Sequence, residues 1–212
     1  TVVSLARMPV IKHYDGICHT YIDKDADLKM AVAIADDAKT HKPGVCNALE
    51  TLLVHKDLAA EFLPQIADVY QQKGVEMRGD AVVLEVLGDR VVAASDEDWD
   101  TEYLDLIIAI KVVDSMADGV HHINTHSSRH SDCIVTADQS RAKQFMTQVD
   151  SACVFHNVST RFSDGGEFGF GAEIGISTDK LHARGPMALR ELTSYQYRIR
   201  GDGQIRAKHA TT

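Results

Sequence analysis

The sequence predicts an α/β fold with an open, mostly parallel sheet flanked by helices. Along most of the chain, segments of strand character alternate with segments whose apolar residues recur at helical spacing, as in α/β proteins. Residues 104–113, LDLIIAIKVV, form a long β-branched run of the kind that parallel sheets bury on both faces. The 212 residues, of which 44% are hydrophobic, are sufficient to bury a core.

The individual elements follow from this alternation. Strands are expected at residues 17–23, 49–54, 104–113, 133–136 and 152–157. Helices are expected between them, at residues 25–39, 57–73, 115–125 and 139–149. Residues 75–94 are predicted to form a small strand, a short helix and another strand. A strand-like segment at 195–200, YQYRIR, precedes a polar tail that we expect to fray.

Composition and charge exclude several classes of function. The formal net charge of −9 and the lack of a Lys/Arg cluster exclude a nucleic-acid partner, because binding to phosphate backbones needs a basic face. The sequence shows no signal peptide and no apolar run of membrane length. Its four cysteines show no Cys-x-x-Cys spacing. We therefore expect a cytoplasmic protein that has no membrane partner and that holds any anionic small substrate with a few arginines or N–H groups.

Cys46 is the strongest candidate for a catalytic group. A polar helical segment ends at Pro43-Gly44, a single cysteine follows in a turn, and an apolar strand begins at Leu49. The thiol is thus expected on a loop between rigid elements, where catalytic groups are often found. It becomes a nucleophile if backbone N–H groups or positive charge stabilise the thiolate. Cysteine is also a common buried filler, so the residue type alone leaves both interpretations open.

Residues 159–172, STRFSDGGEFGFGA, form a glycine-rich segment with little periodicity. A loop of this kind can approach a ligand with its backbone. The spacing of its glycines does not fit the strand-to-helix phosphate turn of dinucleotide-binding proteins. We therefore do not expect a nucleotide loop here.

Four separated blocks of the sequence stand out: DGICH at 15–19, GVCNALETLLV at 44–54, STRFSDGG at 159–166 and LHARGPM at 181–187. Together they resemble the gamma-glutamyl phosphate reductase family, which belongs to the aldehyde dehydrogenase superfamily. The resemblance runs over nearly the whole chain, and four blocks in the right order are more specific than any single motif.

The resemblance implies an aldehyde dehydrogenase-like catalytic domain. Residues 1–158 would form the catalytic α/β domain with the nucleophilic cysteine. Residues 159–212 would form the glycine-rich substrate loop and the segments that return to the cofactor and oligomerisation regions. The part of the family that matches is the C-terminal half, so the N-terminal NADPH-binding half would be absent. Because the chain begins with Thr1 and has no glycine-rich nucleotide loop, we expect a fragment of a longer protein.

The resemblance also implies an activity. It is the NADPH-dependent reduction of the acyl phosphate L-glutamyl 5-phosphate to L-glutamate 5-semialdehyde and phosphate, in proline biosynthesis. Cys46 would be the nucleophile and would form a thioester, and its own backbone N–H is a candidate oxyanion donor. The family resemblance further suggests a homo-oligomer, with glutamate 5-kinase as a candidate partner.

The other site residues leave alternatives open. Arg161 is the best local cation for a substrate carboxylate or phosphate because its planar fork suits both, and the alternative is a surface ion pair. Ser159 and Thr160 could donate to the same anion or cap a turn. Asn47 is assigned to the same substrate site. Glu102 resembles the superfamily glutamate that binds the nicotinamide ribose, but it could equally be one charge of an acidic run.

Histidines raise two further questions. Hydrolytic aldehyde dehydrogenases carry a glutamate base upstream of the cysteine, and His13 or a neighbour takes that slot here, which favours a reductase that does not hydrolyse its thioester. We interpret His13 as a solvated loop residue. His122, His126 and His130 have the spacing of one helix face, as a zinc site would need. Residues 127–129 should end the helix before His130, so we assign no metal.

Two other classes of function stay open. The chain could be an isolated non-catalytic domain of this family that serves assembly or regulation. A cysteine hydrolase would need a histidine partner for Cys46, which spacing cannot reveal.

Overall fold

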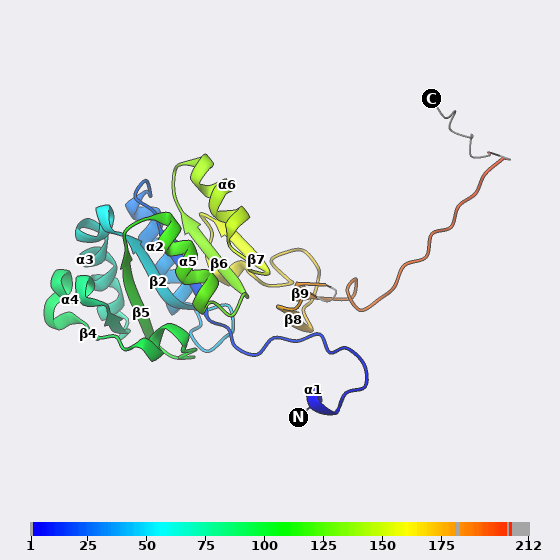
Figure 1. Ribbon diagram of the computed structural model, residues 1–212, viewed down its shortest axis with the longest axis horizontal. Coiled ribbons are helices and arrows are strands. Elements are labelled where there is room, and N and C mark those ends of the chain that lie inside the picture. The colour runs from blue at the N-terminus through cyan, green and yellow to red at the C-terminus, as the bar shows by residue number, and fades with distance from the viewer. Residues whose placement is uncertain (1, 181–182, 203, 205–212) are drawn as a thin grey trace.

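A seven-stranded sheet forms the centre of the computed structural model, which describes residues 2–180, 183–202 and 204. Every strand pair in this sheet is parallel, which agrees with the predicted class. The strands lie in the order β4-β3-β5-β2-β1-β6-β7 (Figure 1). They are β1 (Cys18–Ile22), β2 (Leu49–His55), β3 (Glu76–Gly79), β4 (Val92–Ala93), β5 (Ile107–Val113), β6 (Ser131–Val135) and β7 (Cys153–His156).

Helices cover both faces of the central strands, so every residue of β1 and β2 is buried. One face packs against α2 (Leu28–Thr40), α3 (Lys56–Gln72) and α4 (Ala81–Leu87) in the larger core cluster. The other face packs against α5 (Met116–His126) and α6 (Gln139–Gln148) in a smaller cluster (Figure 1). The predicted helices are therefore present, with ends that differ by a few residues. No helix in the described part of the chain is long and apolar enough to cross a membrane.

Side chains at the helix starts explain where the helices begin. The Asp27 carboxylate accepts the Met30 N–H at 2.8 Å at the start of α2, and the Asp138 carboxylate accepts the Ser140 N–H at 2.7 Å at the start of α6. These bonds satisfy N–H groups that have no partner within the helix. α2 ends at Thr40, shortly before the Pro43-Gly44 break that the sequence indicated.

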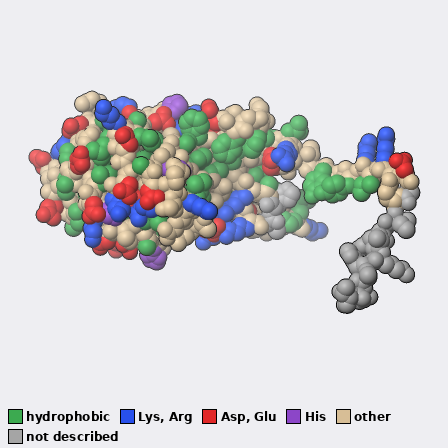
Figure 2. All heavy atoms as spheres, turned by 90° about the horizontal axis from the view of Figure 1, so that it is seen from above, with side chains coloured by type: hydrophobic (Ala, Val, Ile, Leu, Met, Phe, Trp, Pro, Cys, Tyr) green, Lys and Arg blue, Asp and Glu red, His purple; other side chains and the backbone are tan. Residues whose placement is uncertain are grey.

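The C-terminal prediction of a strand at residues 195–200 is wrong. No described strand pairs with this segment, and Tyr195, Tyr197 and Ile199 are 83%, 80% and 92% exposed. The segment extends away from the sheet domain (Figure 1), whose visible face carries interspersed charges of both signs (Figure 2). Of the predicted polar tail after residue 200, residues 201, 202 and 204 are exposed, and residues 203 and 205–212 lie outside the described residues.

Several short elements were not predicted because they have only three to five residues and no readable period. They include an antiparallel pair of strands, β8 and β9, which lies apart from the main sheet. These elements are α1 (Val2–Leu5), η1 (Gly88–Arg90), η2 (Asp96–Asp100), η3 (Thr160–Phe162), β8 (Gly175–Ser177) and β9 (Gly185–Met187).

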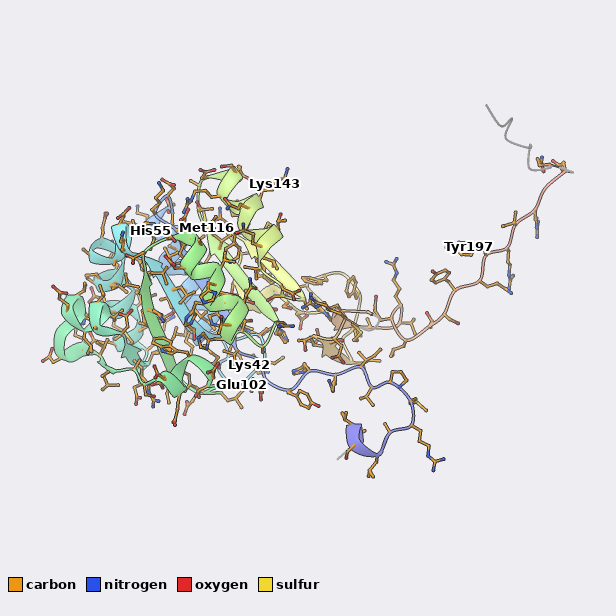
Figure 3. The ribbon with its side chains drawn as sticks, viewed as in Figure 1. Lys42, His55, Glu102, Met116, Lys143 and Tyr197 are labelled. Carbon is orange, nitrogen blue, oxygen red and sulfur yellow. The ribbon has the colours of Figure 1, made fainter. Side chains whose placement is uncertain are left out.

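The parallel topology determines where the loops meet. All strands of the main sheet begin at the same edge, so the segments that precede β1, β2 and β5 come together there. Figure 3 shows Lys42 and Glu102, from two of these segments, at one end of the domain, and His55 and Met116 at the other end. The predicted nucleophile lies at the edge where the strands begin.

Candidate active site

The loop between α2 and β2 carries Cys46. Residues 41–48 turn toward the start of β2, and the Ala48 N–H donates to the Val45 carbonyl at 2.9 Å. Cys46 is half-buried in this turn, whereas the other three cysteines are buried. All four thiols are free. Cys46 is therefore the most accessible thiol in the chain.

Gly16 and Cys18 contact the backbone of Cys46. A Cβ atom on Gly16 would lie 2.1 Å from the Cys46 carbonyl oxygen, so the close approach of the two segments requires glycine. The buried Cys18 thiol donates to the same carbonyl with an Sγ–O distance of 3.3 Å. Burial raises the pKa of Cys18 well above its ordinary value, so this sulfur stays a neutral donor. The DGICH block contained these residues, but their role could not be read from it.

Asn47 and Thr160 join the cysteine loop to the segment that opens the glycine-rich region. The Asn47 amide donates to the Ser163 carbonyl at 3.1 Å and to the Arg161 carbonyl at 3.4 Å. The Thr160 hydroxyl donates to the Asn47 carbonyl at 2.8 Å. Thr160 is fully buried, and its hydroxyl hydrogen is already used in this bond. The hydroxyl therefore holds the two segments together.

Ser159 and Arg161 differ in their environment. The Ser159 hydroxyl accepts the Arg161 N–H at 3.3 Å, so Ser159 caps the η3 turn. The Arg161 guanidinium forms no ion pair with any described residue, and its Nε atom is buried without a partner. It lines a cavity of about 260 Å³ together with His41, Phe162 and the carboxylates of Asp37, Asp164 and Glu167. An unpaired cation beside the cysteine loop can bind an anion.

The local field acts against the Cys46 thiolate. Burial raises the pKa of the Cys46 thiol, and the charges of Glu173 and Glu102 raise it further. The backbone N–H of Cys46 and the charge of Arg161 lower it. Glu173 was missed in the sequence, although it directly follows the glycine-rich segment; its carboxylate accepts the Gly165 N–H at 3.0 Å.

Glu102 lies on the segment before β5, and it contacts the same site. Its Oε1 atom accepts the Gly16 N–H at 2.9 Å, and Gly16 in turn lies against Cys46. Glu102 therefore has a specific partner next to the nucleophile, which distinguishes it from the neighbouring acidic residues of its run.

His13 is not the solvated residue that the sequence suggested. It is half-buried, its Nδ1 atom is buried, and its ring lies edge-on to His130 with centroids 5.6 Å apart. Aromatic packing of this kind removes the ring from water. His130 itself is fully buried, and burial, with the nearby His13, lowers its pKa to about 4. The His130 ring is therefore neutral near pH 7.

The three histidines of equal spacing separate as the sequence predicted, because α5 ends at His126 and His130 lies before β6. His122 and His126 remain neighbours, with ring centroids 4.5 Å apart. Burial and nearby positive charges lower the pKa of His122 to about 2. His126 instead pairs with Asp100 at 2.8 Å. Among the described residues, no cluster of three or more His, Cys, Asp or Glu side chains could hold a metal ion.

The chain has the aldehyde dehydrogenase-like fold, because solved aldehyde dehydrogenases match its arrangement of a parallel sheet flanked by helices. The glyceraldehyde-3-phosphate dehydrogenase of Methanocaldococcus jannaschii, solved in complex with NADP, matches it with a TM-score of 0.55. That match covers 70% of this chain and 41% of the other, at 14% identity, and shows the fold alone.

Over nearly its whole length the chain is similar to gamma-glutamyl phosphate reductases. The gamma-glutamyl phosphate reductase of Ligilactobacillus salivarius (strain UCC118) is 57% identical over 206 residues, which are 97% of this chain and 50% of the relative. The crystal structure of the Thermotoga maritima gamma-glutamyl phosphate reductase matches with a TM-score of 0.91 at 50% identity, over 97% of this chain and 50% of that one. The chain thus spans about half the length of these relatives. No family model matches it.

Proposed function

We propose that this chain is the cysteine-bearing half of an NADPH-dependent reductase that converts L-glutamyl 5-phosphate to L-glutamate 5-semialdehyde and phosphate. One observation carries the proposal. Three separate segments meet at the loop that carries a single half-buried thiol: the Gly16 segment, the Arg161 segment, to which Asn47 of the cysteine loop donates, and the Glu102 loop. This convergence, in a chain 57% identical to a gamma-glutamyl phosphate reductase, supports a catalytic role for Cys46.

Cys46 is the proposed nucleophile. Its thiolate attacks the C5 carbonyl of the acyl phosphate, the C–O bond to phosphate breaks, and phosphate leaves with the electron pair. The substrate is then a thioester on Cys46, whose carbonyl accepts a hydride more readily than a carboxylate does. After reduction, the C–S bond breaks to release the semialdehyde and to restore the thiolate. The Cys46 N–H is the proposed donor to the oxyanion.

Arg161 and Asn47 are the proposed substrate-binding residues. Arg161 has no ion pair in the described chain, so its guanidinium is free to bind a carboxylate or phosphate. The Oδ1 atom of Asn47 is buried without a partner, on the residue that directly follows the nucleophile. Ser159 and Thr160 are proposed to act by holding this segment in place.

Glu102 is the proposed contact to the cofactor. Oε1 of its carboxylate is bonded to Gly16, and its second oxygen makes no hydrogen bond with the described residues, so it fits a ribose hydroxyl. NADPH, when bound, supplies the hydride for reduction of the thioester. The rest of its binding site is proposed to lie in the N-terminal half of the whole protein. An aldehyde dehydrogenase-fold relative was solved with NADP, which supports a nicotinamide cofactor.

Hydrolytic aldehyde dehydrogenases carry a glutamate base upstream of the cysteine, and the residues in the corresponding slot of this chain also support a reductase. The sequence places His13 or a neighbour in it, and His13 packs against the buried His130. With no carboxylate base in that slot to activate water, the thioester is kept for reduction.

We further propose that a domain boundary lies at residue 158 and that the protein is cytoplasmic. We also propose that it forms a homo-oligomer and associates with glutamate 5-kinase. Size-exclusion chromatography with light scattering, with and without the kinase, tests the last two.

The test is Cys46→Ser in the complete enzyme. We expect reductase activity to fall by at least about a thousandfold with the fold intact, because a serine hydroxyl without a base is a far weaker nucleophile at neutral pH. NADPH oxidation with L-glutamyl 5-phosphate, and the phosphate-dependent reverse reaction, measure this. Activity within about tenfold of the parent would overturn the assignment.

A further inference from the structure

Lys39 and Glu50 form an ion pair that is completely buried at the base of the cysteine loop. Lys39 lies in the last turn of α2, and Glu50 is the second residue of β2, so the pair closes the loop that carries Cys46. Lys39 Nζ lies 2.7 Å from Glu50 Oε2, and both side chains are 0% exposed. A buried pair of this kind is rarely more stabilising than apolar residues of the same volume. Its presence therefore calls for an explanation other than stability.

Glu50 also reaches the loop that carries Glu102. Its other oxygen, Oε1, accepts the Leu104 N–H at 3.4 Å. Leu104 has a φ of 56°, a left-handed conformation that a leucine adopts only when its surroundings impose it. A Cβ on Gly44 would lie 3.5 Å from the Leu104 carbonyl, so the Glu102 loop packs directly on the cysteine loop. The Glu50 carboxylate thus bonds both to the last turn of the helix that leads into the cysteine loop and to the Glu102 loop.

The Glu102 loop contacts the cysteine from a second direction. Glu102, two residues before Leu104, accepts the Gly16 N–H, and Gly16 lies against the Cys46 carbonyl. The Lys39 ammonium also lies 5.9 Å from the centroid of the Tyr103 ring, which lies between Glu102 and Leu104. Consecutive contacts therefore connect the Lys39–Glu50 pair to the Glu102 loop, and the Glu102 loop through Gly16 to Cys46.

We propose that Lys39 and Glu50 are positioning residues, whose buried pair holds the Cys46 loop and the Glu102 loop in one fixed relative placement. For the reductase, this keeps the thiol and the proposed ribose contact at a constant separation, which hydride transfer to a thioester requires. The role in catalysis rests on the proposed function; the role in ordering the two loops does not.

The test compares variants of this chain. Lys39→Met/Glu50→Leu replaces both charges by apolar groups of similar size. Glu50→Gln keeps the shape and the acceptor for Leu104 but removes the charge. Lys39→Arg keeps the positive charge and is the conservative substitution, which should behave like the parent. Lys73→Met is the matched control, because it removes an exposed pair, Lys73–Asp36 (2.6 Å), from the same region of α2 and α3.

Two readouts report on the two loops. The rate of Cys46 alkylation by iodoacetamide, with the site identified by mass spectrometry, reports on the cysteine loop. Hydrogen exchange of the Gly16 amide, which donates to Glu102, reports on the other loop. In the folded Lys39→Met/Glu50→Leu variant we expect alkylation to become at least about fivefold faster and Gly16 exchange about tenfold faster, because both loops gain exposure. Lys39→Arg and Lys73→Met should stay within about twofold of the parent.

A folded double variant with both rates within about twofold of the parent would overturn the proposal, since the pair would then have no effect on loop order. If the double variant does not fold, Glu50→Gln decides by the same criteria. If Glu50→Gln also fails to fold, the pair is a stability element and the proposal is wrong. Cys46→Ser in the complete enzyme tests the reductase separately, so each idea can fail without the other.

Discussion

Burial and the charges around Cys46 disfavour its thiolate form in this chain. Individual neighbouring residues raise or lower the pKa of the thiol. Burial and Glu173 raise the pKa of the thiol, and Arg161 lowers it. Removing Glu173 should therefore make the thiol more acidic, and removing Arg161 should make it less so. The sequence revealed the cysteine and the arginine, but it could not reveal the glutamate, because the effect of Glu173 depends on a fold that brings it near residues more than a hundred positions away.

We predict that Glu173→Gln speeds alkylation of Cys46 at mildly alkaline pH by about twofold or more, and that Arg161→Gln slows it by a similar factor. The glutamine can still accept the Gly165 N–H that Glu173 accepts. The measurement is the alkylation rate as a function of pH, with Lys143→Gln on α6, at the far end of the domain (Figure 3), as the control. Equal pH profiles for all three variants would contradict the prediction.

Arg161 and Arg184 make a matched pair of arginines with different predicted roles. Arg161→Lys in the complete enzyme should lower kcat/KM at least about tenfold with little change in Tm, because lysine cannot reproduce a bidentate grip on an anion. Arg184 instead bonds to the side chain and the carbonyl of Asp150, both at 3.1 Å, so Arg184→Lys should lower Tm and leave the kinetics near those of the parent. A fall in Tm with unchanged kinetics for Arg161→Lys would place the anion site elsewhere.

At the scale of elements, the sequence predicted those helices and strands whose pattern lies within a single segment of the chain. The β-branched run predicted β5, the apolar period predicted α2, and the Pro43-Gly44 break predicted the end of that helix. The strand at 195–200 was wrong because its alternating pattern is local, whereas a strand also needs a partner. The bond from Thr160 to Asn47 joins residues 113 positions apart and has no local signal.

The docking of the Gly16 segment on the cysteine loop gives a prediction at this scale. Gly16→Ala should destabilise the chain by about 1–3 kcal/mol, because its Cβ would overlap the Cys46 carbonyl and neither backbone can move cheaply. The control is Gly175→Ala, whose Cβ would meet nothing within 4 Å and which should stay within about 0.5 kcal/mol. Urea unfolding measures both. Equal stability of the two variants would show that the segments are not tightly packed.

At the scale of the whole molecule, the sheet and its helices enclose two core clusters, but the described segments near both ends of the chain carry exposed apolar side chains. Val2, Leu5 and Met8 at one end, and Leu189 and Tyr195 at the other, are each more than 70% exposed. Exposed apolar side chains of this kind fit contacts with another protein surface. The core clusters, in contrast, involve only the sheet and its own helices.

The last prediction concerns whether this chain alone can bind the cofactor and catalyse the proposed reaction. Hydride transfer requires the nicotinamide to be held at near-attack distance from the thioester, and that positioning is most of what a protein contributes to cofactor chemistry. Glu102 is the one cofactor contact proposed for this chain, and a single hydrogen bond to ribose contributes too little for tight binding. We therefore expect this polypeptide to fold cooperatively, to react with iodoacetamide at Cys46, and neither to bind NADPH tightly nor to reduce the acyl phosphate. Isothermal titration with NADPH and a turnover assay, each run beside the complete enzyme, measure this. Binding at about micromolar Kd with steady turnover would show that the cofactor site is encoded within these 212 residues.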